Sequence, residues 1–370
     1  MQPGDRPISV GIIGLSADGG WASLAHVPAL RAMPEHFRIG GLCASTPPRA
    51  EAAARAHEVP FWTHNPAELA RHPDVDLVAV TVKVPHHAQL VQSALAVGKA
   101  VYCEWPLARD TGEAAAMAAA AASAGSRPFV GLQGRAAPAL VHLRELLAGG
   151  FVGEPVSTCV VGAGGFPWGG MATKSMAYAL DRATGATMLT IPFGHMIDTF
   201  TWILGGFEAL NATLLTRFEQ TRLLDADGEA AATGPDQIAV NGRLESGAVA
   251  SLHYYGGGAP GAGFRWEIIG TLGSLVVEGA TGHLQYGHVS VKGRRGDAPL
   301  QDLAVPADHH RVGIDPESYG HAVAHAYRKV HDDLTTGTRT APTFADAIAT
   351  HELLDRIGRA SIRLEERSSQ

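Results

Sequence analysis

The feature that most constrains this sequence is the alternation of strand-like and helix-like segments through residues 8–132. Short, largely apolar runs are typical of strands buried on both faces of a sheet. Helix signals separate them, such as the capping-box spacing between Asp110 and Glu113. Such alternation predicts a parallel, doubly wound sheet. The expected strands are 8–15, 37–43, 61–62, 75–82, 100–103 and 129–132.

The pattern changes in the second half, where strand-like runs follow one another without intervening helices. Such runs indicate a mostly antiparallel sheet. The expected strands are 156–161, 209–217, 237–244, 248–255, 264–269, 274–278 and 288–292. The expected helices are 138–148, 188–204, 318–335 and 344–364, and the expected loops are 162–176, 224–234 and 292–304.

These patterns predict an α/β fold with two domains. Residues 1–135 form an N-terminal Rossmann domain with a doubly wound parallel sheet, which binds NAD(P). Residues 136–370 form a C-terminal α/β domain with a mostly antiparallel sheet, assigned to substrate binding and oligomerisation. Its C-terminal helices are candidates to pack back on the first domain.

Composition excludes several classes of protein. With 46% hydrophobic and 18% charged residues, the chain can build a core and is not intrinsically disordered. Acidic residues outnumber basic ones, 36 to 29, which argues against a nucleic-acid partner because such binding needs a basic face. Three scattered cysteines, and 18 histidines without a ligand spacing such as His-Glu-x-x-His, predict no metal site.

The location of the protein is also constrained by what the sequence lacks. The start, Met1–Pro7, is polar and has no apolar core of signal-peptide length. The most uniform apolar stretch, 114–122, is too short to cross a bilayer. We therefore expect a cytoplasmic protein with no membrane partner.

A glycine-containing turn follows the first strand, with the sequence Gly14-Leu15-Ser16-Ala17-Asp18-Gly19. It is a dinucleotide fingerprint in which serine replaces the middle glycine. Such a turn lets the backbone approach a pyrophosphate at a helix N-terminus, although ordinary strand-to-helix turns also contain glycine. The candidate cofactor-binding residues here are Gly14, Ser16, Gly19 and Trp21.

The end of the second strand carries no carboxylate, where an acid usually binds the ribose hydroxyls. Ser45, Thr46 and Arg49 are found instead, and they do not repel a 2′-phosphate. The expected cofactor is therefore NADP or NAD, with NADP favoured. The alternative is that Arg49 is a solvated helix charge.

Further candidate residues follow the fourth and fifth strands, at the sheet edge where ligands bind. They are Val82, Lys83 and His87 after the fourth strand, and Glu104, Trp105 and Pro106 after the fifth. Later in the chain, His195 and Asp198 lie three residues apart on a predicted helix, so an imidazole and a carboxylate can reach one site.

Together, the fingerprint, the Glu-x-Pro sequence after the fifth strand and the Gly194-His195-x-x-Asp198 helix resemble the glucose-fructose oxidoreductase, inositol dehydrogenase and MocA (Gfo/Idh/MocA) family. Glu104-Trp105-Pro106-Leu107 and Ile191-Pro192-Phe193-Gly194-His195 are more similar to the branch that contains the fungal galactose-regulon repressor. The resemblance implies an NAD(P)-binding fold, a homo-oligomer (dimer or tetramer), and either an enzyme or a regulator.

Two departures from the family pattern affect the expected chemistry. The family's Glu-Lys-Pro lysine is replaced by Trp105, and an aspartate four residues before the histidine is replaced by Ile191. The remaining catalytic candidates are His195 as acid or base and Asp198 beside it, with Lys174 and Tyr178 as helpers. The alternatives are a hydrogen-bonded core histidine and plainly exposed loop residues.

The sequence thus predicts an NAD(P)-dependent oxidoreductase that transfers hydride between nicotinamide and a sugar, polyol or related hydroxy compound. The missing lysine motivates a second hypothesis, a non-catalytic NAD(P)-binding regulator that acts through a protein partner. A nucleotide-independent sugar-binding module is the third.

Overall fold

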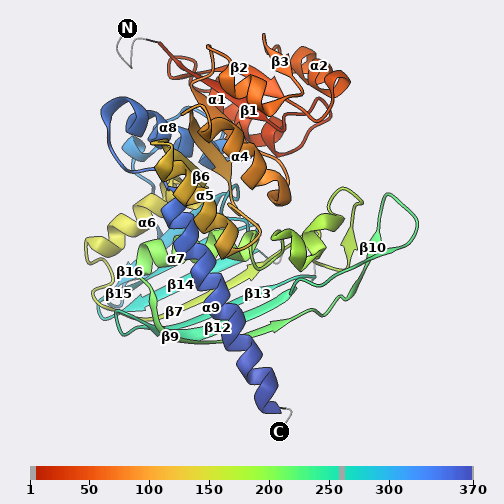
Figure 1. The fold of residues 1–370 in the computed structure, drawn as a ribbon. Coiled ribbons are helices and arrows are strands. Elements are labelled where there is room, and N and C mark those ends of the chain that lie inside the picture. Colours follow the sequence, from red (N-terminus) through yellow and green to blue (C-terminus); the bar gives the residue numbers. More distant parts are fainter. Residues whose placement is uncertain (1–5, 258–262, 369–370) are drawn as a thin grey trace. The chain divides into compact units, whose positions relative to one another are not determined.

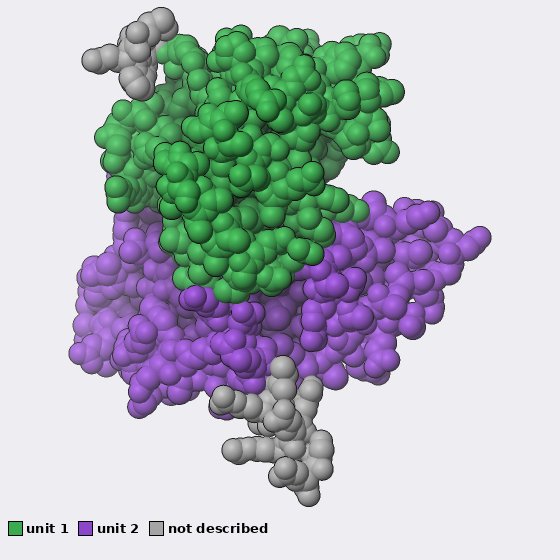
Figure 2. Space-filling view, in the orientation of Figure 1, with its two compact units in different colours: residues 1–136, 311–349 green, residues 137–310, 350–370 purple. Residues whose placement is uncertain are grey.

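The computed structural model describes residues 6–257 and 263–368, with side chains to residue 361. Most of the polar start discussed above, Met1–Asp5, lies outside the described residues. The chain forms two compact units (Figure 2). Unit 1 comprises residues 1–136 and 311–349, and unit 2 comprises residues 137–310 and 350–370.

Unit 1 is built on a six-stranded sheet in the order β3-β2-β1-β4-β5-β6, and every pair of neighbours is parallel. This confirms the expected doubly wound sheet. The strand order reverses at β1, so the carboxyl ends of β1 and β4 flank the topological switch point. The strands are β1 (Ile8–Ile13), β2 (Phe37–Cys43), β3 (Trp62–Thr63), β4 (Leu77–Val80), β5 (Ala100–Glu104) and β6 (Pro128–Gly131).

Two helices of unit 1 begin at residues whose side chains cap them. Asp110 accepts a hydrogen bond from the Glu113 backbone N–H (2.8 Å), while the Glu113 carboxylate accepts one from Arg109 N–H. Asn65 caps helix 66–71 by accepting a hydrogen bond from Ala67 N–H (3.0 Å). The helical segments before residue 137 are η1 (Ala22–His26, a π-helical turn), α1 (Val27–Arg31), α2 (Pro47–Ala56), α3 (Pro66–Arg71), η2 (Val84–His86), α4 (His87–Leu95), α5 (Thr111–Ser123) and η3 (Gln133–Arg135).

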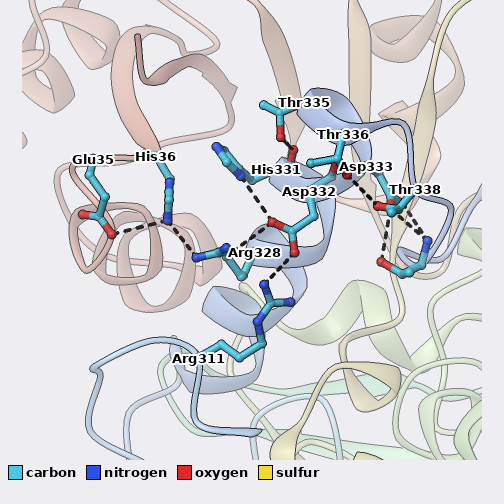
Figure 3. Close-up of polar contacts among 11 residues, drawn as sticks. Glu35, His36, Arg311, Arg328, His331, Asp332, Asp333, Thr335, Thr336 and Thr338 are labelled. Atoms are coloured by element: carbon cyan, nitrogen blue, oxygen red, sulfur yellow. Dashed lines mark hydrogen bonds and ion pairs between the residues drawn. The ribbon is translucent and has the colours of Figure 1, made fainter. Parts of the chain in front are cut away.

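Residues 311–349 return to unit 1 through α8 (His321–Thr336) and a polar cluster at its surface (Figure 3). Asp332 accepts hydrogen bonds from Arg311 (2.7 Å) and Arg328 (3.0 Å). Arg328 in turn lies 2.8 Å from His36 Nε2, just before β2. The cluster therefore ties the returning segment to α8 and α8 to the start of β2.

The next residue of α8, Asp333, is buried and holds the turn that follows the helix. Its carboxylate accepts hydrogen bonds from the hydroxyl of Thr338 (2.7 Å) and from the backbone N–H groups of Thr340 and Ala341 (both 2.9 Å). Beyond this turn, Phe129 of β6 forms a bridge to Thr343. The turn thus directs the chain back onto the edge of the parallel sheet.

Unit 2 contains an eight-stranded sheet in the order β17-β16-β15-β14-β7-β13-β12-β9. Among the described strand pairs of this sheet, only β7 with β13 is parallel. This confirms the expectation of a mostly antiparallel sheet. Its strands are β7 (Pro155–Ala163), β9 (Phe207–Leu215), β12 (Gln237–Leu244), β13 (Val249–Tyr255), β14 (Phe264–Gly270), β15 (Gly273–Gly279), β16 (Val289–Arg295) and β17 (Gln301–Asp302).

Three segments of unit 2 expected to be loops contain short strands, so those expectations are partly wrong. Residues 224–234 include β11 (Glu229–Ala231), which pairs with β10 (Gln220–Leu223), and β10 pairs with β8 (Met171–Ala172) inside the expected loop 162–176. In the segment 292–304, β16 continues to Arg295 and pairs with β17. The strands β8, β10, β11 and β17 are two to four residues long and therefore too short to show a clear apolar alternation, so the sequence did not reveal them.

Long helices accompany the large sheet of unit 2 (Figure 1). On α7, Phe200 lies over Trp266 of β14, with ring centroids 5.4 Å apart. The later part of α9 is bound to β9 through Ser361, whose Oγ accepts the Leu214 N–H (3.1 Å). No helix in the described ranges combines the length and apolar character needed to cross a membrane. The remaining helical segments are α6 (Pro138–Ala148), η4 (Ala177–Leu180), η5 (Arg182–Thr184), α7 (Pro192–Leu204), η6 (Ala307–His309) and α9 (Phe344–Ser368).

Candidate functional site

In unit 1 the turn after β1 depends on two glycines. Gly14 has φ +105°, and a Cβ there would lie 2.7 Å from Val82 Cγ1. Gly19 has φ +108°, with open space where its Cβ would stand. Positive φ is strained for residues other than glycine, so both positions need glycine. A turn with these two glycines at the end of β1 fits the close approach of a pyrophosphate.

Ser16, which replaces the fingerprint's middle glycine, is fixed by its neighbours. Its backbone oxygen accepts hydrogen bonds from Ser23 (2.8 Å) and His57 Nε2 (2.9 Å), and its hydroxyl accepts the Asp18 N–H (3.2 Å). Trp21 directly precedes the π-helical turn η1. The serine is therefore compatible with the turn, and His57 is a supporting residue that the sequence analysis missed.

At the end of β2, the residues predicted to bind the ribose lie on the surface. Arg49 Nη1 donates to Ser45 Oγ (3.3 Å), and Ser45, Thr46 and Arg49 are all exposed. Arg49 lies in the first turn of α2, one turn beyond Ser45. The structure therefore brings a hydroxyl and a guanidinium together at this edge.

After β4, the predicted residues differ in what they present to a ligand. Lys83 is exposed and Val82 is half-buried against Gly14. His87 is buried, which lowers its pKa, and its ring nitrogens lie 2.9 Å from Val82 O and 3.2 Å from Leu107 O. Because both nitrogens face backbone carbonyls, we expect His87 to hold the backbone at this edge of the sheet rather than to bind a nucleotide directly.

Glu104, at the end of β5, is the centre of a buried polar network. Gln133 Nε2 lies 2.9 Å and 3.0 Å from its two carboxylate oxygens. His26 Nε2 lies 3.0 Å from Glu104 Oε1, and His26 Nδ1 lies 2.8 Å from the hydroxyl of Tyr327. The carboxylate therefore has a fixed orientation at the carboxyl edge of the sheet.

Trp105 and Pro106 follow Glu104 and are also buried, with Trp105 only 4% exposed. The position where the family lysine is expected thus carries a large aromatic ring and no amine. The ring does not supply a proton donor of the kind that a lysine would.

In unit 2, His195 lies in the first turn of α7 and is 3% exposed. Burial, together with the nearby His283, lowers its pKa to about 3, so the imidazole is neutral near pH 7. Its Nδ1 is buried without a hydrogen-bond partner. Since a buried unsatisfied polar atom costs free energy, a ligand group that bonds to Nδ1 is favoured.

Asp198 lies one turn further along α7 and is 1% exposed. Its Oδ1 accepts a hydrogen bond from the hydroxyl of Thr350 on α9 (2.9 Å). The structure thus places His195 and Asp198 on one buried helix, as predicted, and connects the carboxylate to α9.

The two predicted helper residues lie in the segment between β8 and α7. Lys174 is exposed, and its backbone N–H donates to Asp225 Oδ1 (2.7 Å). Tyr178 lies in η4 and is half-buried, and burial raises its pKa. Their catalytic roles remain predictions.

His283 is a residue of this site that the sequence analysis missed. Its Nε2 donates to Gly164 O (2.8 Å) and its Nδ1 accepts from Gln285 (3.0 Å), so its tautomer is fixed; burial lowers its pKa to about 4. Gly164 fits against Met188, because a Cβ there would lie 2.4 Å from the sulfur. The segment 162–176, expected to be a loop, therefore starts beside the segment that leads into α7.

Some of the missed residues left a signal in the sequence and others did not. Gln133 directly follows an expected strand, where polar residues of parallel sheets meet ligands, and so could have been found. His26 lies in a largely apolar helical stretch that also contains Ser23 and Arg31, so it does not stand out. Nothing near His283 in the sequence indicates its closeness to His195.

The glycine turn, parallel sheet and buried carboxylate define unit 1 as a dinucleotide-binding Rossmann unit. Comparison with known families agrees: the family described as "Oxidoreductase family, NAD-binding Rossmann fold" matches residues 8–132, and "Gal80p, C-terminal domain" matches residues 138–279. The chain belongs to the Gfo/Idh/MocA oxidoreductase family, with a Gal80p-like C-terminal domain.

Individual relatives include both enzymes and a regulator. Dehydrogenase aclE of Aspergillus oryzae is 34% identical over 74% of this chain and 77% of its own length. The galactose/lactose metabolism regulatory protein GAL80 of Saccharomyces cerevisiae is 27% identical over 85% of this chain and 76% of its own length. A crystal structure of a super-repressor mutant of Gal80p from Saccharomyces cerevisiae has a TM-score of 0.86 at 23% identity, covering 97% and 96% of the two chains.

A sugar dehydrogenase has the same fold. Levoglucosan dehydrogenase, solved in complex with NADH and levoglucosan, has a TM-score of 0.81 at 22% identity, covering 97% of this chain and 98% of the other. The chain is therefore a member of an oxidoreductase family with an NAD-binding fold, and its relatives include both dehydrogenases and a regulatory protein.

Proposed function

We propose that the protein is an NAD(P)-dependent oxidoreductase that acts on a CH–OH group of a sugar, polyol or related hydroxy compound. The observation that carries the proposal is the Nδ1 atom of His195, a buried nitrogen without a partner on a helix whose spacing the family shares. A substrate hydroxyl would satisfy it. The similarity to dehydrogenase aclE supports the class of reaction, and the similarity to levoglucosan dehydrogenase supports the class of substrate.

Each residue has a separate part in the proposed reaction. The nicotinamide ring of the bound cofactor would supply the hydride acceptor. His195, neutral at physiological pH, accepts the hydroxyl proton at Nδ1 during oxidation and returns it during reduction. Asp198 stabilises the positive charge that develops on the His195 imidazole when it accepts this proton. Lys174 and Tyr178 contact the substrate. Because burial makes the imidazolium costly, the proton must be passed on rather than retained.

The residues of unit 1 fit NAD(P) as the cofactor. Gly19 leaves open space beside the backbone, Gly14 lets the turn pack against Val82, and Gln133 and His26 hold the Glu104 carboxylate in place. Arg49 and Ser45, at the end of β2 where an acid would select NAD, favour NADP. We therefore propose NADP as the preferred cofactor and NAD as the alternative.

We also propose a homo-oligomer in the cytoplasm, formed through the open face of the large sheet. Apolar side chains on its strands are exposed, among them Val161 of β7, Val249 of β13 and Ile269 of β14. A single sheet face with exposed apolar residues is suited to self-association. Light scattering that finds only monomer at micromolar concentration would contradict this.

The decisive experiment measures turnover and binding separately. Purified protein is mixed with NAD⁺ or NADP⁺ and a panel of sugars and polyols that includes levoglucosan, and nicotinamide reduction is followed by absorbance. With an active substrate, His195→Asn should lower kcat by roughly 10²–10⁴-fold, the usual contribution of a general acid or base, and leave nucleotide binding intact. His310→Asn, at an exposed position outside both sheets, is the matched control.

A non-catalytic NAD(P)-binding regulator is the second candidate, favoured by Trp105 in place of the family lysine. If the wild type binds nucleotide without turnover across the panel, the catalytic proposal is wrong. A protein partner whose release depends on NAD(P) or sugar would then identify the regulator. A nucleotide-independent sugar-binding module is excluded if titration with NAD(P) changes the fluorescence of Trp21 or Trp105.

A further inference from the structure

Unit 2 brings two histidines and a glutamate together on a surface that contains none of the site residues described above. His142 and Glu145 lie three residues apart on α6, and His309 ends η6. One ligand atom from each lies within 4.8 Å of the other two. The sequence analysis predicted no metal site, because no ligand spacing connects His309 with the distant residues of α6.

The His142 ring has a nitrogen that is not used in a hydrogen bond. Its Nδ1 is buried without a hydrogen-bond partner, although the residue as a whole is half-buried. The ring packs edge-on against that of His309, with centroids 5.7 Å apart. An imidazole nitrogen that is hidden from water and has no partner is in a suitable position to bind a metal ion.

His309 is oriented in the way that metal-bound histidines usually are. Its Nδ1 lies 3.1 Å from the Asp308 carboxylate, and its Nε2 lies 2.7 Å from Glu145 Oε2. A carboxylate on one ring nitrogen fixes the ring and raises the basicity of the other, which then faces the ion. Glu145 is exposed on the same helix face as His142.

We propose that His142, Glu145 and His309 form a zinc site, with Asp308 as the supporting carboxylate. Two imidazole nitrogens and one carboxylate oxygen suit Zn²⁺ rather than Mg²⁺ or Ca²⁺, which prefer oxygen ligands. A water completes the tetrahedral site because Glu145 is exposed to solvent. Binding at His309 Nε2 releases to solvent the proton that it shares with Glu145.

A zinc ion at this site would fix the position of the segment around η6. η6 ends at His309, and the chain leaves unit 2 immediately afterwards, at residue 310. The ion would link this segment to α6, so metal binding should raise the thermal stability of unit 2. The proposal is independent of nucleotide binding and of turnover.

The test uses untagged, full-length protein freed of metal and then titrated with Zn²⁺ by calorimetry, with Mg²⁺ as a second titrant. We expect one equivalent of Zn²⁺ to bind and Mg²⁺ not to bind. Glu145→Gln, which keeps the size of an exposed side chain, and His142→Ala should each weaken Zn²⁺ binding at least tenfold. Asp308→Asn should weaken it roughly 10–100-fold. Bound Co²⁺ should give the strong visible bands of four-coordinate geometry.

His310→Ala is the matched control, since His310 is exposed and adjacent to His309. Its Zn²⁺ affinity should equal that of the wild type, and circular dichroism of the metal-free variants should be unchanged. Zn²⁺ should raise the thermal midpoint of the wild type but not that of Glu145→Gln. The proposal is overturned if less than one equivalent binds, or if Glu145→Gln and His142→Ala bind as tightly as His310→Ala.

Discussion

The side-chain nitrogen of Gln133 lies 2.9 Å and 3.0 Å from the two carboxylate oxygens of Glu104. Glu104 ends β5 and Gln133 follows β6, so the contact joins the carboxyl ends of two neighbouring parallel strands. Between them, a Cβ on Gly131 would lie 2.7 Å from Glu104 Oε1. The backbone of β6 is therefore shaped to admit this pair, which fixes the orientation of the carboxylate.

Gln133→Leu should destabilise unit 1 and weaken NAD(P) binding. The leucine fills the space but leaves the buried Glu104 carboxylate without this donor, and hydrogen bonds to charged groups contribute about 1.5–3 kcal/mol. We expect the free energy of unfolding to fall by about 2 kcal/mol in urea, and the Kd for the nucleotide to rise several-fold. Gln89→Leu, on the exposed face of α4, is the control. Equal effects of the two substitutions would contradict the assigned role.

The two glycines of the dinucleotide turn should respond differently to alanine. Both have positive φ, which costs an alanine roughly 1–2 kcal/mol. Gly14→Ala adds a clash with Val82 and Thr81, whereas the Cβ of Gly19→Ala meets open space. We therefore expect Gly14→Ala to lower the thermal midpoint further. Gly19→Ala should mainly weaken nucleotide binding, measured by fluorescence titration. Identical midpoints would show that the clash is relieved.

The fold was largely predictable from the sequence because both sheets leave strong local patterns. The apolar run 77–80 is buried throughout, and alternation along β13 follows its two faces. The short strand 229–231 was missed because it is mostly exposed and has only three residues, so it shows no apolar pattern. It is held by hydrogen bonds to β10.

The candidate site was predictable only where function depends on residues close together in the chain. The Gly14 turn and the His195–Asp198 pair are local motifs. The contacts of His283 with Gly164 and of Thr350 with Asp198 join residues more than 100 positions apart, so no spacing reveals them. The pKa of His195 likewise depends on burial, which its intrinsic value near 6.5 does not show.

Two adjacent aspartates on α8 should differ in their importance for stability (Figure 3). Asp333 is buried and holds the turn at 338–341 through the backbone N–H groups of Thr340 and Ala341. Asp333→Ala leaves these donors unpaired, so we expect a loss of about 3 kcal/mol in the free energy of unfolding. Asp332→Ala breaks partly exposed ion pairs with Arg311 and Arg328 and should cost about 1 kcal/mol. Chemical denaturation compares them, and equal losses would contradict the prediction.

Arg49 should determine whether the protein binds NADP more tightly than NAD. If its guanidinium binds the 2′-phosphate, Arg49→Ala should raise the Kd for NADP roughly tenfold and leave that for NAD nearly unchanged, because one hydrogen bond to a charged group is lost. Arg55→Ala, exposed near the end of α2, is the control. Titration calorimetry with both nucleotides measures the ratio. Parallel changes for NAD and NADP would mean that Arg49 acts only as a surface charge.

The buried histidines of unit 2 should make stability depend on pH. Burial lowers the pKa from 6.5 to about 3 for His195 and to about 4 for His283. Between pH 6.5 and 4 the unfolded chain therefore binds protons that the folded chain does not. Stability is fully present above pH 6.5 and is lost as the pH falls, by about 1.4 kcal/mol per pH unit for each such group.

His195→Asn removes one of these groups and should make the slope of unfolding free energy against pH shallower by about one proton between pH 6 and 4.5. Carboxylates that titrate in this range contribute equally to both proteins, so the difference isolates His195. Urea denaturation at several pH values measures the slopes. His310→Asn, at an exposed position outside both sheets, should leave the slope of the wild type unchanged. If His195→Asn gives the same slope as His310→Asn, the folded His195 imidazole takes up its proton in the same pH range as in the unfolded chain, and the lowered pKa is wrong.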